Sequence, residues 1–499
     1  MAKLNKSWDD FSLNAAIGTS ITDTRTSALR LDSKTASLYY PNVFTIANIN
    51  MSSSAYIEES DDVRRQMQSF FAMAQLGYKE SLYLDVTARN DWSSTLAFTE
   101  RKSRGFFYPS VGLSWIIPKS FSMPSLISFG KVRASWSKVG NDIPLFVSNT
   151  VGHIAAGGIP QPNDTAPFGT LKPEMSSSFE IGTEWKFFDY RMDVDLTFYK
   201  TNTKNQLFSL PSSAGAAYKY YFVNAGNIQN MGVELTLGAV PILTNQFKWN
   251  TTLNFSRNKN EVKKLHDDLA SFIQGDEGFS SSYTMRLVEG GSFGDIYGKA
   301  FERDKYGAIV YGRDGLPQEI GSGNTAKVGN CNPAFLLGWG NSFTYKDFSF
   351  YFLIDGHFGG DVLAQTQAVL DQTGVSKVSG ETRTMGYVDL EGHHIYNIKG
   401  FYEQVGGRNG VTEYYMYDAT NIRLRELSLG YTLPKRLLGR KQFVKKAELS
   451  FVARNLFFIY KKAPFDPDAV LSASNSNQGI DIFGIPTTRS VGFNVKLSF

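Results

Sequence analysis

The sequence predicts an all-β fold, an antiparallel transmembrane β-barrel with short periplasmic turns and long extracellular loops. Segments in which apolar and polar residues alternate recur along the 499 residues, which is the pattern of strands with two different faces. These segments run about 10–12 residues, whereas soluble strands average about 5–6 and tilted membrane strands need about 9–11. The connections between the segments alternate between long and short, as they do in outer-membrane barrels.

The end of the chain shows the alternation most clearly. One face of this last segment carries only apolar residues, and the other carries small or polar ones. The apolar set is Val491, Phe493, Val495, Leu497 and Phe499, and the opposite set is Gly492, Asn494, Lys496 and Ser498. A soluble β-sandwich alternates in the same way, so the prediction of a barrel depends on strand length and on the connections.

About fourteen strands are expected from this pattern. They lie near 10–20, 68–79, 80–90, 107–117, 128–138, 177–188, 189–201, 229–239, 246–258, 334–345, 346–356, 421–433, 445–457 and 488–499. Long connections are expected at 21–67, 139–176, 258–333, 357–420 and 458–487, and short ones at Lys79-Glu80, Asp189 and Lys346-Asp347. If the short turns are periplasmic, the strand count is even and the C-terminus is periplasmic.

Two segments interrupt the regular pattern. Residues 284–311 either add two membrane strands or form a hairpin in an outer loop, and we favour the hairpin because Gly290-Gly291 and a run of charges break any apolar face. In the strand 421–433 the apolar residues change phase, which predicts a β-bulge near Arg425-Glu426.

Composition excludes several classes of protein. The formal net charge is only +4 and no basic stripe is present, so nucleic acid is not expected as a partner. No apolar run approaches the roughly 18 residues of a membrane helix. The single cysteine, Cys331, rules out an intrachain disulfide and is interpreted as an incidental small residue in a turn.

Nothing in the sequence points to catalysis, and no cofactor is expected. The five histidines accompany no nucleophile elbow. His393-His394 is a metal site or, by preference, part of a solvated loop. Asp466-Pro467-Asp468 is a calcium ligand set or, by preference, a turn after a strand.

Clusters of tyrosine are the candidates for ligand or partner contact, because tyrosine combines a flat apolar face with a polar tip. The alternative is that they form an interfacial girdle or a loop core. The candidates, all in outward connections, are Tyr39, Tyr40, Tyr218, Tyr220, Tyr221, Tyr414, Tyr415 and Tyr417.

Three stretches in the last part of the chain occur in the order and spacing of a known family. They are YDATNIRLRELSLGYTLPKRLL (417–438), LSFVARNLFFIYKKAPFDPD (449–468) and GIDIFGIPTTRSVGFNVKLSF (479–499). Earlier segments, including ARNDWSSTLAF (88–98) and NAGNIQNMGVELTL (224–237), fit the same family. On these motifs the sequence resembles SusC/RagA-type TonB-dependent outer-membrane receptors over nearly its whole length.

The resemblance implies a fold, a function and partners. Such proteins have a barrel of about 22 strands that is plugged by an N-terminal domain, and residues 1–499 resemble its C-terminal part only. The plug, the TonB-contacting segment and the export signal are then expected upstream. The resemblance implies import of glycans or oligopeptides across the outer membrane of a Gram-negative bacterium, with a SusD-like surface lipoprotein and the TonB complex as partners and outer-membrane lipid around the barrel.

Two other functions remain open from the sequence alone. A passive porin of about 14 strands, complete as written, would account for an even strand count. An outer-membrane enzyme would need a loop triad, which we do not find. The terminal Phe499 is expected to be an assembly signal, because the chain stops on an alternating strand with an aromatic carboxy-terminus.

Overall fold

The computed structural model describes residues 1–499 except 34–35, 51–56, 101–104, 156–158, 162, 167–170, 213–214, 267–268, 275–281, 322–324, 439–442 and 471–476. The chain divides into two compact units. Unit 1 comprises 1–121, 132–181 and 201–228, and unit 2 comprises 122–131, 182–200 and 229–499.

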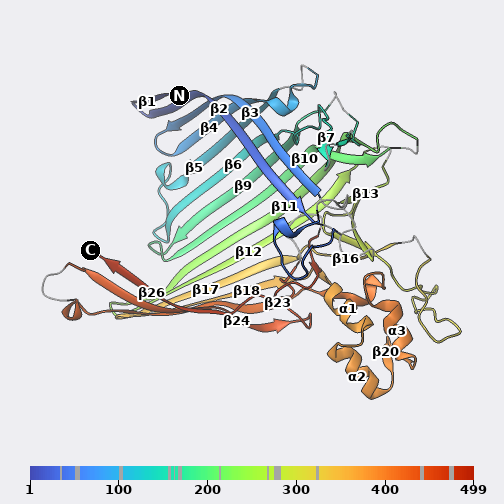
Figure 1. Cartoon of the computed structure of the whole chain (residues 1–499). Helices are drawn as coiled ribbons and strands as arrows, with labels where there is room; N and C mark the ends of the chain where they lie inside the picture. The colour runs from blue at the N-terminus through green and yellow to red at the C-terminus, as the bar shows by residue number, and fades with distance from the viewer. Residues whose placement is uncertain are drawn as a thin grey trace. The chain divides into compact units, whose positions relative to one another are not determined.

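Fifteen strands of the described residues form one large sheet, in which the strands lie side by side in the order in which they occur in the sequence (Figure 1). The strands are β1 (Ala2–Trp8), β2 (Phe11–Asp32), β3 (Ile57–Tyr78), β4 (Leu82–Ser93), β5 (Gly105–Ile116), β6 (Ile127–Asn141), β9 (Glu174–Phe187), β10 (Met192–Pro211), β11 (Tyr220–Leu243), β12 (Phe247–Lys264), β17 (Phe335–Tyr345), β18 (Phe348–Phe358), β23 (Asn421–Thr432), β24 (Lys446–Lys461) and β26 (Ser490–Ser498). Pairing is antiparallel from β1 to β5 and from β12 through β17, β18, β23 and β24 to β26. The prediction of an all-β antiparallel fold is confirmed.

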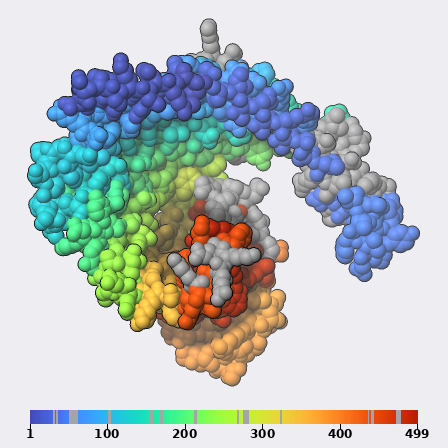
Figure 2. Space-filling model, turned by 90° about the vertical axis from the view of Figure 1, so that its left-hand side faces the viewer, coloured from blue at the N-terminus to red at the C-terminus, as the bar shows by residue number. Residues whose placement is uncertain are grey.

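The prediction of an even number of strands was wrong, because the large sheet of the described residues has fifteen. All fourteen expected strands are present, but β1 precedes them and pairs with β2 from Ala2 opposite Ile17 to Trp8 opposite Phe11. Every residue of β1 is exposed, and Figure 2 shows this strand in dark blue along the margin of unit 1. Its only large apolar side chains are Leu4 and Trp8, so alternation is too weak to mark a strand in the sequence.

The expected connection 21–67 is shorter than predicted, because β2 and β3 are each 22 residues long. Polar pairs support the added length where apolar alternation has ended. Arg25 pairs with Asp62, and Arg64 pairs with Asp23 across the same two strands. A search for apolar periodicity cannot detect a strand that is held by charged cross-strand pairs.

Unit 1 has a sheet with two chemically different faces. Leu13, Leu76, Leu84 and Leu113 are successive partners across β2 to β5 and form an apolar row. The adjacent row on the other face is polar. Within it Asn14 donates to Gln75, and Gln75 donates to Asp85.

Unit 2 repeats this division. The successive partners across β17, β18, β23, β24 and β26 are Phe343, Phe350, Leu429, Phe451 and Phe493. Leu429 remains 52% exposed and Phe493 76%, so this apolar row is left uncovered over several strands. An uncovered apolar row of this length is expected for a surface that faces lipid rather than water.

The short turns and the bulge are where the sequence predicted them. Lys79 and Glu80 both have positive φ, of 50° and 51°, as the two central residues of a type I′ turn require, and the backbone N–H of Ser81 donates to the carbonyl of Tyr78 to close it. In β23 the pairing with β18 passes from Leu424 to Glu426, so Arg425 is the additional residue of a β-bulge. The bulge lets Arg423 and Glu426 face the polar side while Leu424 and Leu427 face the apolar side.

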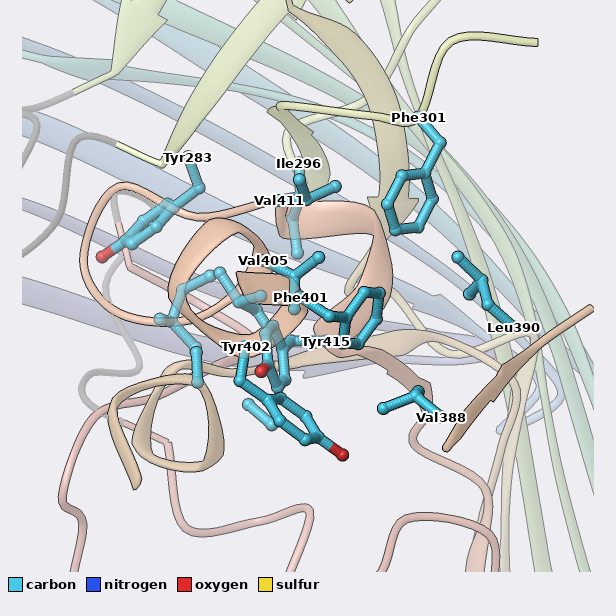
Figure 3. Packing of buried hydrophobic residues seen from close by; sticks show 14 of the residues in the cluster. Tyr283, Ile296, Phe301, Val388, Leu390, Phe401, Tyr402, Val405, Val411 and Tyr415 are labelled. Atoms are coloured by element: carbon cyan, nitrogen blue, oxygen red, sulfur yellow. The ribbon is translucent and has the colours of Figure 1, made fainter. Parts of the chain in front are cut away.

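A second hydrophobic core lies in what is called the loop body here, which consists of the described residues within 271–330, 361–418 and 480–482 of unit 2. Its buried core includes Ile296, Phe401, Tyr402 and Tyr415 (Figure 3). Its elements are β13 (Ser271–Gln274), β14 (Tyr283–Val288), β15 (Asp295–Gly298), β16 (Ala326–Asn330), β19 (Asp361–Ala364), α1 (Gln365–Gln372), α2 (Lys377–Met385), β20 (Val388–Leu390), β21 (His393–Ile395), α3 (Ile398–Val405), β22 (Met416–Asp418) and β25 (Ile480–Asp481). The hairpin expected within 284–311 is confirmed, since β14 and β15 pair in a separate four-stranded sheet.

The helices were not predicted, because no long helical pattern is present. They are eight or nine residues long. In the described part of the chain, none has the length and hydropathy that crossing a membrane would require. The remaining strands, β7 (His153–Ala155) and β8 (Ile159–Gln161), form a small hairpin in unit 1.

Candidate functional site: a polar cavity on the sheet of unit 2

A cavity of about 530 Å³ opens on the polar face of unit 2. Two rows of cross-strand partners, running over β12, β17, β18 and β23, supply most of its walls. One row is Asn254, Gly338, Asp355 and Arg423, and the next is Ser256, Leu336, His357 and Asn421. Glu234 and Thr236 of β11, Arg425 of β23 and Asp468, from the connection after β24, complete the polar lining.

Gly338 accounts for part of the hollow. A Cβ atom at this position would have a single neighbour within 4 Å, the Cβ of Asn254 at 3.9 Å. The absence of a side chain in the middle of the first row therefore leaves space above the sheet. A larger residue at Gly338 would fill the cavity without a steric clash at its base.

Two arginines and two aspartates form the charged part of the wall. Arg423 is only 3% exposed, and its Nε lies 3.3 Å from Oδ1 of Asp355 while its Nη2 donates to Asp468. Arg425 donates from Nε to Oδ2 of Asp355 at 2.8 Å. The bulge and the pleat thus bring both guanidinium groups to one carboxylate, and Asp468 is held by the same cluster.

The cluster leaves hydrogen-bonding capacity unused. Within the described residues, Nη1 of Arg423 and Nε2 of His357 are buried and have no hydrogen-bond partner. The guanidinium of Arg423 also lies over the Phe458 ring, 5.4 Å from its centre, which is within the range of a cation–π contact. Because cations and carboxylates are mixed, the wall can bind donors and acceptors alike and repels neither sign of charge.

The predicted tyrosine candidates divide into two groups. Tyr39 and Tyr40 are 60% and 72% exposed, and Tyr218, Tyr220 and Tyr221 are 36–45% exposed, so all five are accessible to a ligand or partner. No observation tests their role, and ligand contact at these positions stays a prediction.

Tyr414, Tyr415 and Tyr417 instead belong to the loop body, which was the alternative considered for them. Tyr415 is 2% exposed and donates to Oδ2 of Asp371 at 3.0 Å, and burial raises the pKa of its hydroxyl well above the usual value. Tyr414 packs edge-on against Phe401 at 5.2 Å. A role in ligand contact for these three is also untested, but their packing accounts for their presence.

The terminal Phe499 is 62% exposed and lies 5.1 Å from Phe443, centre to centre. Its assembly role stays a prediction.

Asp466 forms a turn, because its carboxylate accepts from the backbone N–H groups of Asp468 and Thr487. Within the residues that the structure covers, no group of three or more acidic, histidine or cysteine side chains is placed to hold a metal ion.

Sequence reasoning missed the cavity. Its one local signal was a charge in an apolar strand: Asp355 follows the run Phe350–Ile354, and Arg423 lies between Ile422 and Leu424. The alternation in each strand indicates that Asp355 and Arg423 point to the polar face. It does not indicate that the two residues are opposite each other on β18 and β23.

A family model described as "TonB dependent receptor-like, beta-barrel" matches residues 3–456. The chain is 26% identical over 489 residues to "TonB-dependent receptor P3" of Formosa agariphila, covering 90% of this chain and 47% of that protein. It is 22% identical to "TonB-dependent receptor SusC" of Bacteroides thetaiotaomicron, covering 89% and 46%. Residues 1–499 therefore span about half the length of these curated relatives.

Among solved structures, the "RagAB peptide transporter" matches all of this chain and 54% of that one with a TM-score of 0.77 and 18% identity. At that level of identity the match supports the fold alone. Members of this family are outer-membrane proteins, and those of SusC/RagA type work with TonB and a SusD/RagB-like lipoprotein.

Proposed function

Because the chain belongs to the TonB-dependent receptor-like β-barrel family, we propose that it is the barrel portion of an outer-membrane importer of glycans or oligopeptides. The observation that carries the proposal is the division of the sheet into two faces. The row from Phe343 to Phe493 is apolar and uncovered, and the cavity with Arg423 and Asp355 lies on the opposite face. An apolar outer face suits lipid, and a polar inner face suits a hydrated path.

In this proposal, polar cargo binds in the cavity as it passes along that path. Its mixed charges and amides offer donors and acceptors to hydroxyl groups or to peptide groups. The side chains form no catalytic arrangement in this proposal, and the barrel acts by binding and guiding its cargo. A passive porin is not proposed, because its support was the even strand count, and the large sheet has fifteen strands in the part of the chain that the structure describes.

The partners follow from the same proposal. The long connections and the loop body lie on the outer side, where a SusD-like lipoprotein would cover the opening. Energy would arrive from TonB through a part of the protein outside residues 1–499. The short turns, such as Lys79-Glu80, would lie on the periplasmic side.

The test uses the natural host, with the gene for the protein that carries this chain deleted and then restored. Uptake of fluorescent oligosaccharides and oligopeptides is measured with and without a protonophore, which collapses the gradient that energises TonB. We expect uptake to return with the gene and to stop with the protonophore. Uptake that needs the gene but continues after the gradient is lost would contradict the proposal.

A further inference from the structure

The hairpin of β20 and β21 presents one face to the core of the loop body and the other to solvent. Val388, Leu390 and Ile395 are 2%, 7% and 2% exposed, and Figure 3 shows Val388 and Leu390 on the side of the core. Alternate residues of a strand point to opposite faces. The residues on the outward side are Tyr387, Asp389, His394 and Tyr396.

The hairpin holds these four side chains in a fixed arrangement. Glu391 and Gly392 form a two-residue turn, with φ of 51° and 85°. Oδ1 of Asp389 accepts from the backbone N–H of Gly392 at 2.8 Å and closes the turn. The other oxygen, Oδ2, lies 3.6 Å from Nε2 of His394 on the paired strand.

Aromatic rings extend on both sides of this pair. The ring of Tyr387 stacks on His394 at 4.0 Å between centres and an angle of 25°. The ring of Tyr396 lies 6.5 Å from that of Tyr387 at 60°, and the residue remains 75% exposed. The exposed ring of Tyr396 thus lies next to Tyr387, which in turn covers one face of the His394 imidazole. Strand alternation places Tyr396 on the same face of the hairpin as His394 and Asp389.

We propose that this outward face binds a sugar unit of a neutral oligosaccharide. The apolar C–H face of a pyranose ring matches the exposed ring of Tyr396. Its hydroxyl groups both donate and accept, and Asp389 supplies an acceptor while the ring nitrogens of His394 supply a donor and an acceptor. The proposal rests on the proposed function for its outer-side location, and it selects glycans over peptides as the cargo that is captured.

A peptide fits this face less well. The two strands of the hairpin are three residues each, so they offer too short an edge for an extended peptide to add as a further strand. A side chain that stacked on Tyr396 would leave Asp389 and His394 without the neighbouring hydroxyl groups that a sugar provides. The combination of ring and planar polar groups therefore favours the carbohydrate.

The test measures binding of neutral gluco-, manno- and xylohexaose, and of an alanine-rich hexapeptide, to the purified full-length protein in detergent by calorimetry. We expect one or more of the oligosaccharides to bind and Tyr396→Ala to weaken that binding about tenfold. The matched control is Tyr306→Ala, because Tyr306 is 81% exposed on the same body and contacts Lys305. His394→Phe keeps a ring against Tyr387 but removes both nitrogens, and should also weaken binding.

The outcomes separate this proposal from the proposed function. Absence of oligosaccharide binding, equal effects of Tyr396→Ala and Tyr306→Ala, or an effect of Tyr396→Ala on peptide alone would overturn the sugar site. Binding that depends on Tyr396, together with uptake that needs no energy, would support the sugar site and contradict the importer. A near-ultraviolet circular dichroism spectrum identical to that of the wild type confirms that each variant is folded.

Discussion

The charged cluster in the cavity predicts that Asp468→Asn destabilises the protein although Asp468 is a loop residue. The change keeps the size of the side chain but removes one of the two carboxylates that face Arg423 and Arg425. Arg423 is 3% exposed, so it cannot recover the lost interaction by turning to water. Two guanidinium groups would then share Asp355.

The magnitude follows from burial. Breaking a fully buried ion pair costs about 3–5 kcal/mol. The side chain of Asp468 is 31% exposed and Asp355 remains as a partner, so solvent and the second carboxylate reduce the cost. We expect a loss of about 1–3 kcal/mol in the free energy of unfolding, which lies below the range for fully buried pairs and above that for exposed ones.

The assay is reversible unfolding by guanidinium chloride in lipid vesicles, monitored by tryptophan fluorescence. The control is Asp164→Asn, because its pair with Lys219 is exposed on both sides, at 55% and 71%. Exposed pairs contribute about 0–1 kcal/mol, so this variant should unfold almost as the wild type does. Equal losses for the two variants, or no loss for Asp468→Asn, would refute the role given to the buried arginine.

Four further predictions test other parts of the fold. Val495→Lys should cost about 2–4 kcal/mol of folding free energy in lipid vesicles, whereas Asn494→Lys should be nearly neutral, and equal effects would show that the faces are misassigned. Deletion of Phe499 should lower outer-membrane abundance strongly but leave the unfolding temperature of the assembled protein almost unchanged; normal abundance would exclude a signal role. Gly338→Leu should fill the cavity and reduce uptake without loss of folded protein, and unchanged uptake would place the path elsewhere. Burial raises the pKa of the Cys331 thiol to about 11. Because the thiolate is the nucleophile, native protein at pH 8 should react with iodoacetamide at least about tenfold more slowly than unfolded protein. Equal rates would contradict the burial of this thiol.

The sequence was most informative where each strand carries its own signal. Val491 to Leu497 alternate with polar residues, and β26 lies there. The phase change in 421–433 located the bulge at Arg425, because one additional residue reverses the parity of every residue after it. Strand β1 was missed because its apolar alternation is too weak, with only Leu4 and Trp8 as large apolar residues. The far ends of β2 and β3 were missed because polar pairs, such as Arg25 with Asp62, occur there in place of an apolar face.

The cavity and the sugar site could not be predicted in this way. Asp355 and Arg423 are 68 residues apart in the sequence, and only the register of β18 against β23 makes them partners. The four outward residues of the β20–β21 hairpin lie close together in sequence, but whether they face solvent depends on Val388 and Ile395 being buried in a core assembled from distant segments. His393 and His394 were considered as a pair from the sequence, whereas in the structure the ring of His393 lies tilted against Tyr311 and that of His394 stacks on Tyr387.

The sequence by itself determined the fold class, the positions of fourteen strands and their two faces, because period-two alternation is a local property that each strand expresses alone. The tertiary structure decided which polar residues meet, since hydrogen-bond register joins residues that no local pattern connects. It also decided that Tyr415 is core while Tyr396 is surface. Both are tyrosines in the same long connection, and only the packing of α1, α3 and β19 around one of them distinguishes a residue that stabilises the loop body from one that is free to bind.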